Sequence, residues 1–125
     1  MVCINKHNEL LTTINSFLNL RTNWDSYNAE VISFDAIKTA HRVLQFLDES
    51  GYIFNEFETH VFPMRDGGIQ FEFDNNNESS ELEINPLGEL KFIRYDKEGN
   101  MLNTTNLAVN KLTELSHLLE ETDHA

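Results

Sequence analysis

The chain has 125 residues, of which 40% are hydrophobic, which is enough for one domain around one core and too few for two that fold independently. Its 21 acidic residues against 9 basic ones give a formal net charge of −12. This charge disfavours direct binding to nucleic acid or to an anionic membrane. It leaves a basic protein partner, a bound cation or plain solubility as explanations.

The single cysteine, Cys3, excludes an internal disulfide and a zinc site built from several cysteines, and it fits a reducing compartment. The N-terminal segment lacks a basic region followed by an apolar run, and no stretch approaches the roughly 20 apolar residues of a membrane span. We therefore expect a cytoplasmic protein, and the sequence predicts no cofactor.

Two helices are predicted before Gly51. Apolar residues recur at three- and four-residue steps from Leu10 to Leu18, which predicts a first helix over about 8–20. A second helix is predicted from Ser33, a good N-cap with Asp35 in its first turn, to Gly51, a natural C-terminal stop. Its apolar side is predicted to consist of Phe34, Ile37, Ala40, His41, Leu44 and Leu47.

After Gly51 the hydrophobic period changes to two, as "GGIQFEFD" and "SELEIN" illustrate, which is typical of half-buried antiparallel strands. The turn-rich segments "NNNESS", "NPLGE" and "DKEGN" separate four predicted strands, over 58–62, 69–74, 80–85 and 89–95. A short fifth strand near Met101 is an open alternative.

The tail predicts a third helix over about 106–121, with Asn106 as its cap and leucines at helical intervals. The order of elements indicates an α+β fold: two N-terminal helices, an antiparallel sheet of about four meandering strands and one C-terminal helix. We expect the helices to cover one face of the sheet and leave the other to solvent or a partner.

The uncovered face is predicted to be acidic. If the second and third strands form a hairpin, Gln70 and Glu72 lie on the same face as Glu81 and Glu83, within roughly 5 to 8 Å of one another. Like charges directly opposite each other destabilise a sheet, so either the register staggers them or the patch is kept for a cationic partner. A solvated surface partly neutralised by Lys91, a protein-binding patch, and a metal or catalytic carboxylate pair stay open as interpretations.

The next strand adds other side chains to this face. In "ELKFIRYD", Ile93 and Tyr95 point to the same side as Lys91, so an aliphatic and an aromatic residue lie beside the acids. Apolar and aromatic residues surrounded by charge are typical of an interface core.

The linker between the first two helices contains "NWDSYNAE", residues 23–30, with the only tryptophan of the chain. One interpretation is a structural plug, in which the rings of Trp24 and Tyr27 are buried and Asp25 or Glu30 supplies a hydrogen-bond acceptor. The other is an exposed hot spot for a partner, because tryptophan and tyrosine are enriched in such positions.

This segment, followed by "FPMRDGGIQFEFD" and then by "ELEI", resembles a group of small acidic bacterial proteins with NWDxYxA and GGIQxE segments. The matching positions are Trp24, Asp25, Tyr27, Ala29, Gly67, Gly68, Gln70, Glu72, Glu81 and Glu83. Asn28 and Asp74 stand where that group has glycine and tryptophan or a similar residue. The resemblance implies a bacterial origin and a shared fold over about 23–95, and it carries over no catalytic residue.

Two functions follow as hypotheses. The first is a non-enzymatic interaction module of the immunity, antitoxin or inhibitor sort that binds a basic protein partner. Its predicted contact residues are Trp24, Asp25, Tyr27, Gln70, Glu72, Glu81, Glu83 and Tyr95. The alternative is a metal-dependent hydrolase or small-ligand binder that uses Glu72, Glu81 and Glu83.

Overall fold

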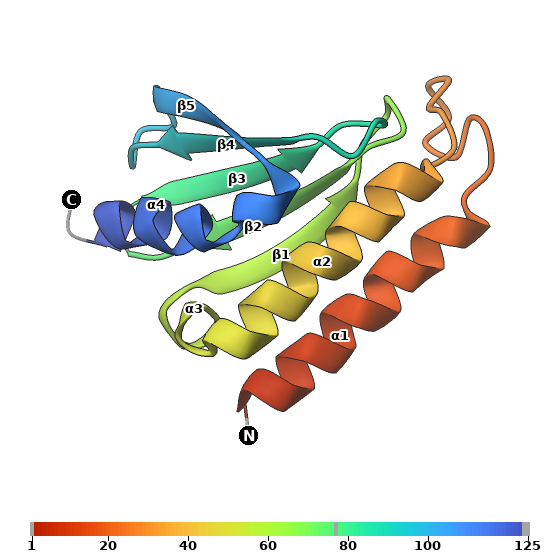
Figure 1. Cartoon of the computed structure of the whole chain (residues 1–125). Helices are drawn as coiled ribbons and strands as arrows, with labels where there is room; N and C mark the ends of the chain where they lie inside the picture. Colours follow the sequence, from red (N-terminus) through yellow and green to blue (C-terminus); the bar gives the residue numbers. More distant parts are fainter. Residues whose placement is uncertain (1, 77, 124–125) are drawn as a thin grey trace.

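The structure is a computed structural model that describes residues 2–76 and 78–123. A five-stranded antiparallel sheet forms one layer and helices form the other (Figure 1). The helices are α1 (Val2–Ser16), α2 (Phe34–Ser50), α3 (Tyr52–Glu56) and α4 (Thr113–Asp123), with the short 3-10 helices η1 (Phe17–Asn19) and η2 (Val109–Lys111). The strands β1 (Glu58–Pro63), β2 (Ile69–Asp74), β3 (Ser79–Ile84), β4 (Leu90–Tyr95) and β5 (Met101–Leu107) pair in chain order as a meander. The predicted α+β class is confirmed.

The main departure from the predicted elements is β5, which is a full strand of seven residues. It includes Asn106 and Leu107, which we expected to begin the C-terminal helix, so α4 begins only at Thr113. The ladder to β4 decides this, because Asn106 pairs with Lys91 and the backbone groups that face β4 are satisfied there. The short helix α3 was also not predicted.

The ends of α2 agree with the prediction, whereas α1 begins earlier than predicted. Helix α1 starts at Val2, and its last turn tightens into η1. The Ser33 side chain accepts a hydrogen bond of 3.0 Å from the Ala36 N–H, so the predicted cap of α2 is confirmed. Gly51 has a φ of +70° and ends α2, as expected.

The prediction of the buried side of α2 was wrong at two positions. Phe34 is 78% exposed, and His41 is exposed and hydrogen-bonded to Asn15 of α1 at 2.9 Å. These residues are seven apart and therefore lie on one line of the helix, at the edge of the buried stripe. The stripe itself consists of Ala36, Ile37, Thr39, Ala40, Val43, Leu44 and Leu47.

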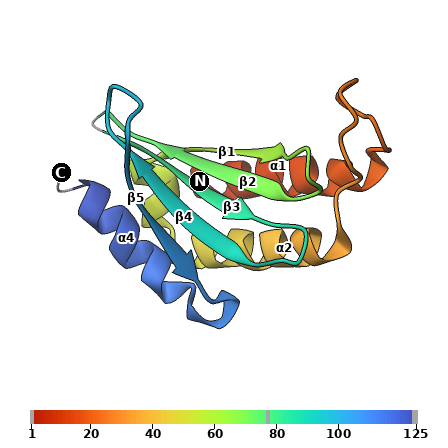
Figure 2. The ribbon, with the colours of Figure 1, turned by 90° about the horizontal axis from the view of Figure 1, so that it is seen from above.

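The core lies between the helices and one face of the sheet. Phe71, Leu82 and Phe92 occupy one cross-strand row and are fully buried, and Leu115 and Leu119 of α4 belong to the same hydrophobic cluster. Burying one such side chain contributes about 1.5–3 kcal/mol. Figure 2 shows the strands in front of α1 and α2, so none of the described helices lies on the second face of the sheet.

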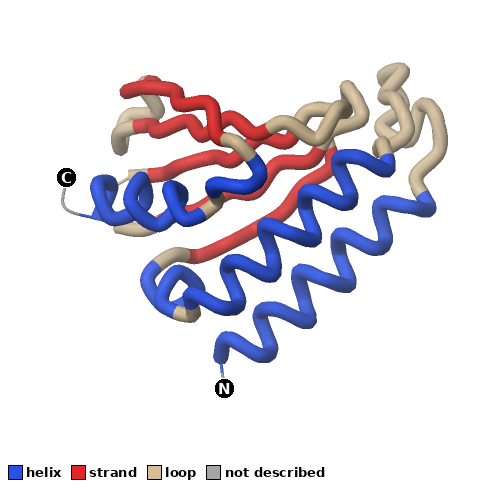
Figure 3. Tube along the Cα trace, in the orientation of Figure 1, coloured by secondary structure: helices blue, strands red, loops and turns tan. Residues whose placement is uncertain are grey.

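The loops at one end of the sheet gather together. The linker over 20–33 lies beside the β1–β2 and β3–β4 turns (Figure 3). Ser33 donates a hydrogen bond of 2.7 Å to the Pro86 carbonyl, and Thr39 donates one of 2.9 Å to the Gly88 carbonyl, so α2 is fastened to the β3–β4 turn. Within the described part of the chain, none of the helices combines the length and apolar character that a bilayer crossing requires.

Candidate functional site

The sheet face turned away from the helices holds most of the predicted site residues. We call it the acidic face, and it comprises Gln70, Glu72 and Asp74 of β2, Glu81 and Glu83 of β3, and Lys91, Ile93 and Tyr95 of β4. These positions alternate with the buried core positions along each strand. The prediction that Gln70, Glu72, Glu81 and Glu83 share one face is confirmed.

The register places two glutamates directly opposite each other. Glu72 pairs with Glu81, and the neighbouring pair is Gln70 with Glu83, so the strands do not stagger the charges. Partial burial raises the pKa of Glu72, and the neighbouring Asp74 and Glu81 raise it further, while His60 on β1 lowers it in part. Partial burial also raises the pKa of Glu81, where the charges of Glu83 and Asp74 add to the effect. Each carboxylate is therefore harder to ionise than an isolated one.

Cations compensate for this charge only in part. Lys91 lies directly opposite Glu83, and its ammonium nitrogen is 3.7 Å from the Glu83 carboxylate. His60 pairs with Glu72 across β1 and β2, but its ring nitrogen is 3.1 Å from the carboxylate of Glu58. Among the residues that define the acidic face, Lys91 is the one cation beside four carboxylates, so the face keeps a negative field.

The two apolar positions of the acidic face behave differently. Ile93 is only 4% exposed, although it lies on the open face opposite Glu81 and Thr104, so the expectation that it adds an exposed aliphatic side chain to this face was wrong. The Tyr95 hydroxyl donates a hydrogen bond of 3.2 Å to Glu81. Burial together with the charge of Glu81 raises the pKa of Tyr95, which stays a neutral donor. Tyr95 therefore orients Glu81 and remains half exposed.

The "NWDSYNAE" segment forms a tight loop beyond the end of the sheet. The Asp25 carboxylate accepts hydrogen bonds from the backbone N–H groups of Tyr27 at 2.8 Å and Ala29 at 3.1 Å. Burial would raise the pKa of Asp25, but these two hydrogen bonds and the charge of Arg65 outweigh it and leave the pKa below its ordinary value. Asn28 has a φ of +66°, a conformation that glycine adopts readily and asparagine tolerates.

The two aromatic residues of this loop have separate roles. Trp24 packs against the core, and its indole N–H donates a hydrogen bond of 2.7 Å to the Glu30 carbonyl, so the plug interpretation fits Trp24. Tyr27 is 71% exposed, and the guanidinium of Arg65 lies 6.0 Å from the centre of its ring. Only Tyr27 presents its ring to solvent. The loop lies beyond the β1–β2 turn and is separate from the acidic face (Figure 2).

The β1–β2 turn docks directly onto this loop. Arg65 forms an ion pair of 2.9 Å with Asp25 and also donates a hydrogen bond to the Tyr27 carbonyl. The backbone N–H of Glu30 donates to the Arg65 carbonyl at 2.8 Å. A Cβ atom on Gly68 would lie 2.2 Å from the Ile84 carbonyl oxygen, so only glycine fits there. The β1–β2 turn therefore contacts the "NWD" loop through Arg65 and β3 through Gly68.

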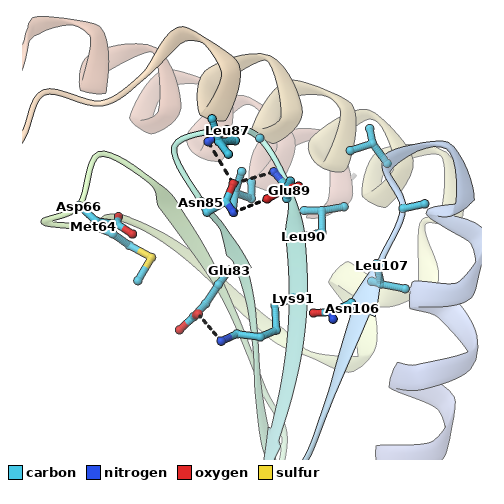
Figure 4. Close-up of a pocket in the computed structure, with 14 residues that line it drawn as sticks. Met64, Asp66, Glu83, Asn85, Leu87, Glu89, Leu90, Lys91, Asn106 and Leu107 are labelled. Carbon is cyan, nitrogen blue, oxygen red and sulfur yellow. Dashed lines mark hydrogen bonds and ion pairs between the residues drawn. The ribbon is translucent and has the colours of Figure 1, made fainter.

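Sequence reasoning missed a groove at the same end of the sheet (Figure 4). It has a volume of about 770 Å³ and lies between the β1–β2 turn, the β3–β4 turn and the end of β5. Met64, Asp66 and Leu87 line it together with Glu83 and Lys91 of the acidic face. The groove therefore continues the acidic face toward Leu87, which is exposed. The "NPLGE" turn, with a leucine among turn formers, was the one signal of it in the sequence.

No three His, Cys, Asp or Glu side chains among the described residues are grouped so that they could hold a metal ion. Comparison of the chain with models of protein families, with curated proteins and with solved structures finds no match. The bacterial resemblance of residues 23–95 stays a prediction.

Proposed function

We propose that this protein is a non-enzymatic interaction module that binds a basic partner protein through its acidic face, as immunity proteins, antitoxins and inhibitors do. The observation that carries the proposal is the direct pairing of Glu72 with Glu81 in the sheet register. No observation among the described residues favours the metal-dependent alternative over it.

The pairing has a cost that a cationic partner would remove. Two carboxylates directly opposite each other repel, and the pKa values of both are raised, first by partial burial and further by neighbouring acidic groups. A lysine or arginine side chain placed between Glu72 and Glu81 would turn this repulsion into attraction on both sides. An arginine could also engage a carboxylate through two parallel hydrogen bonds.

The net charge acts at longer range. A charge of −12 attracts a basic protein before contact and repels acidic ones, which raises the association rate and selects partners. Tyr95 and the exposed Leu87 would add aromatic and apolar contacts at the ends of the acidic face, where the charges alone give little affinity. The resemblance and the single cysteine favour a bacterial protein of the cytoplasm.

The test is capture of partners on the immobilised protein from an extract of cells that express it naturally. At about 0.1 M salt the Debye length is about 10 Å, and at about 0.5 M it falls below about 5 Å. We expect a basic protein to be retained at the lower salt and released at the higher one. Recovery of no protein at either salt, or of a partner that salt does not release, would contradict the proposal.

A further inference from the structure

The outer edge of β5 is an open strand edge without charge. β5 is the last strand of the sheet and pairs with β4 on one side. The segment over 99–110 contains no Asp, Glu, Lys or Arg, although such residues make up 24% of the chain. Met101 is 58% exposed and Leu102 47% exposed. Proteins usually protect an edge with lysine, proline or a covering element, and β5 has neither lysine nor proline.

The backbone of this edge is available for pairing. Within the described part of the chain, the backbone hydrogen bonds outside helices and strands do not involve Met101–Leu107. Figure 1 places α4 below β5, with Leu115 and Leu119 in the core, and Figure 2 shows α4 running past the outer side of β5, so a strand added to this edge would lie over α4. Alternate N–H and C=O groups of an edge strand point outward and need a partner strand or water.

The opposite edge of the sheet is protected by contrast. β1 ends in Pro63, which has no N–H to donate, and begins with the charged Glu58. Helix α1 also packs against β1. An added strand therefore finds fewer free donors and more charge at β1 than at β5.

We propose that β5 pairs antiparallel with β5 of a second copy of this chain, around a two-fold axis perpendicular to the sheet. With Thr104 opposite its own counterpart, Asn103 faces Thr105, Leu102 faces Asn106 and Met101 faces Leu107. Polar residues then meet at the centre and apolar residues meet at both ends, and no charged side chain is opposed to another.

The charge distribution selects a second copy over a basic partner. A neutral strand gives a basic chain no electrostatic gain, whereas two highly acidic copies can approach each other only where neither carries charge. The register shift between β4 and β5 skips Leu102, so the proposed pairing is regular over 103–105, while the pairs Leu102–Asn106 and Met101–Leu107 include the irregular end of the strand. The two acidic faces would lie on the same side of one continuous sheet.

Salt separates this inference from the proposed function. Two acidic copies repel at long range, so screening strengthens the β5 pairing, while it weakens the binding of a basic partner. Sedimentation velocity from micromolar to millimolar protein at about 0.1 M and about 0.5 M salt should show a monomer–dimer equilibrium that shifts toward dimer at the higher salt. A monomer under all of these conditions would overturn the inference and leave the proposed function untouched.

The matched variants are Thr104→Lys and His60→Lys. Thr104 and His60 lie in the same cross-strand row at opposite edges of the sheet. Thr104→Lys places two ammonium groups at the two-fold axis, so we expect the dimer dissociation constant to rise at least tenfold, while His60→Lys leaves it within twofold. Equal dissociation constants for the two variants would overturn the inference.

A cross-link tests the register without depending on those variants. Opposed residues of an antiparallel pair have Cα atoms about 4.5–5.5 Å apart, which a disulfide spans. In a Cys3→Ser background, Thr104→Cys should give a reducible dimer on mild oxidation, and His60→Cys should not. If the Thr104→Cys chain cross-links no faster than the His60→Cys chain, β5 is not the interface.

Discussion

The opposed glutamates of β2 and β3 give the most direct energetic prediction. Glu72→Gln and Glu81→Gln each remove one of two like charges that face each other in the register. For carboxylates about 6 Å apart and an effective dielectric constant of about 60 at this half-exposed face, Coulomb repulsion amounts to about 1 kcal/mol. Measured cross-strand pairs give about 0.2–1 kcal/mol. We therefore expect each variant to raise the unfolding free energy at pH 7 by about 0.5–1 kcal/mol.

The double variant should raise the unfolding free energy by less than the sum of the two single variants, because the first substitution already removes the repulsion. Urea unfolding followed by the fluorescence of Trp24, the only tryptophan, measures each value. Glu30→Gln, at an exposed residue of the linker, is the control for the change in net charge.

The raised pKa values of Glu72 and Glu81 determine the direction in which the unfolding free energy changes with pH. The pKa of each carboxyl is raised in the folded state, so the folded protein binds more protons and its stability falls as pH rises above the ordinary value of 4.5. In the Glu72→Gln and Glu81→Gln variants, stability should decrease less as pH rises. Their higher unfolding free energy should disappear well below pH 4.5, where the carboxyl groups are protonated in both the folded and the unfolded state. The reasoning is refuted if Glu72→Gln and Glu81→Gln match Glu30→Gln, or if their gains persist at low pH.

Two further predictions concern the β1–β2 turn, the first its contact with β3 and the second its contact with the linker. Gly68→Ala puts a Cβ atom 2.2 Å from the Ile84 carbonyl oxygen, so we expect a loss of about 3 kcal/mol or more in urea unfolding, while Gly99→Ala, with no atom within 4 Å and a φ of +84°, should lose only about 1 kcal/mol. Equal losses would show that the close approach is not what requires glycine. Asp25→Asn removes the charge paired with Arg65, so its melting temperature at pH 7 should fall below that of the wild type. Because the pKa of Asp25 is lowered on folding, the higher melting temperature of the wild type should be lost as pH falls through 3.8 and below. Melting curves of both proteins at pH 7 and below pH 3.8 check this prediction.

Local patterns predicted the elements whose side chains alternate or whose ends carry a cap. β2 reads as strict alternation in "IQFEFD", and its bounds in the structure agree with the predicted ones. Ser33 and Gly51 marked the ends of α2 because their chemistry is local. The common face of Glu72 and Glu81 followed from the same alternation and a turn-rich connection.

Long-range pairing decided the features that were not predicted. In "MLNTTNL" the exposed residues run on without alternation, so β5 is recognisable only through its ladder to β4. Ile93 is buried although it lies on the open face, between Glu81 of β3 and Thr104 of β5, which no single-strand pattern reveals. The groove near Leu87 likewise joins three segments that are far apart in the sequence.

The measurement that tests the acidic face most directly compares the amount of partner retained by three immobilised proteins at about 0.1 M salt. These are the wild type, a variant with Glu72, Glu81 and Glu83 replaced by glutamine, and a control with Glu9, Glu30 and Glu49 replaced by glutamine. Both variants lose the same charge, but the three control residues are exposed and lie on the helices and the linker. We predict that the control retains the basic partner as the wild type does and that the acidic-face variant loses it. Equal retention by both variants would contradict the account.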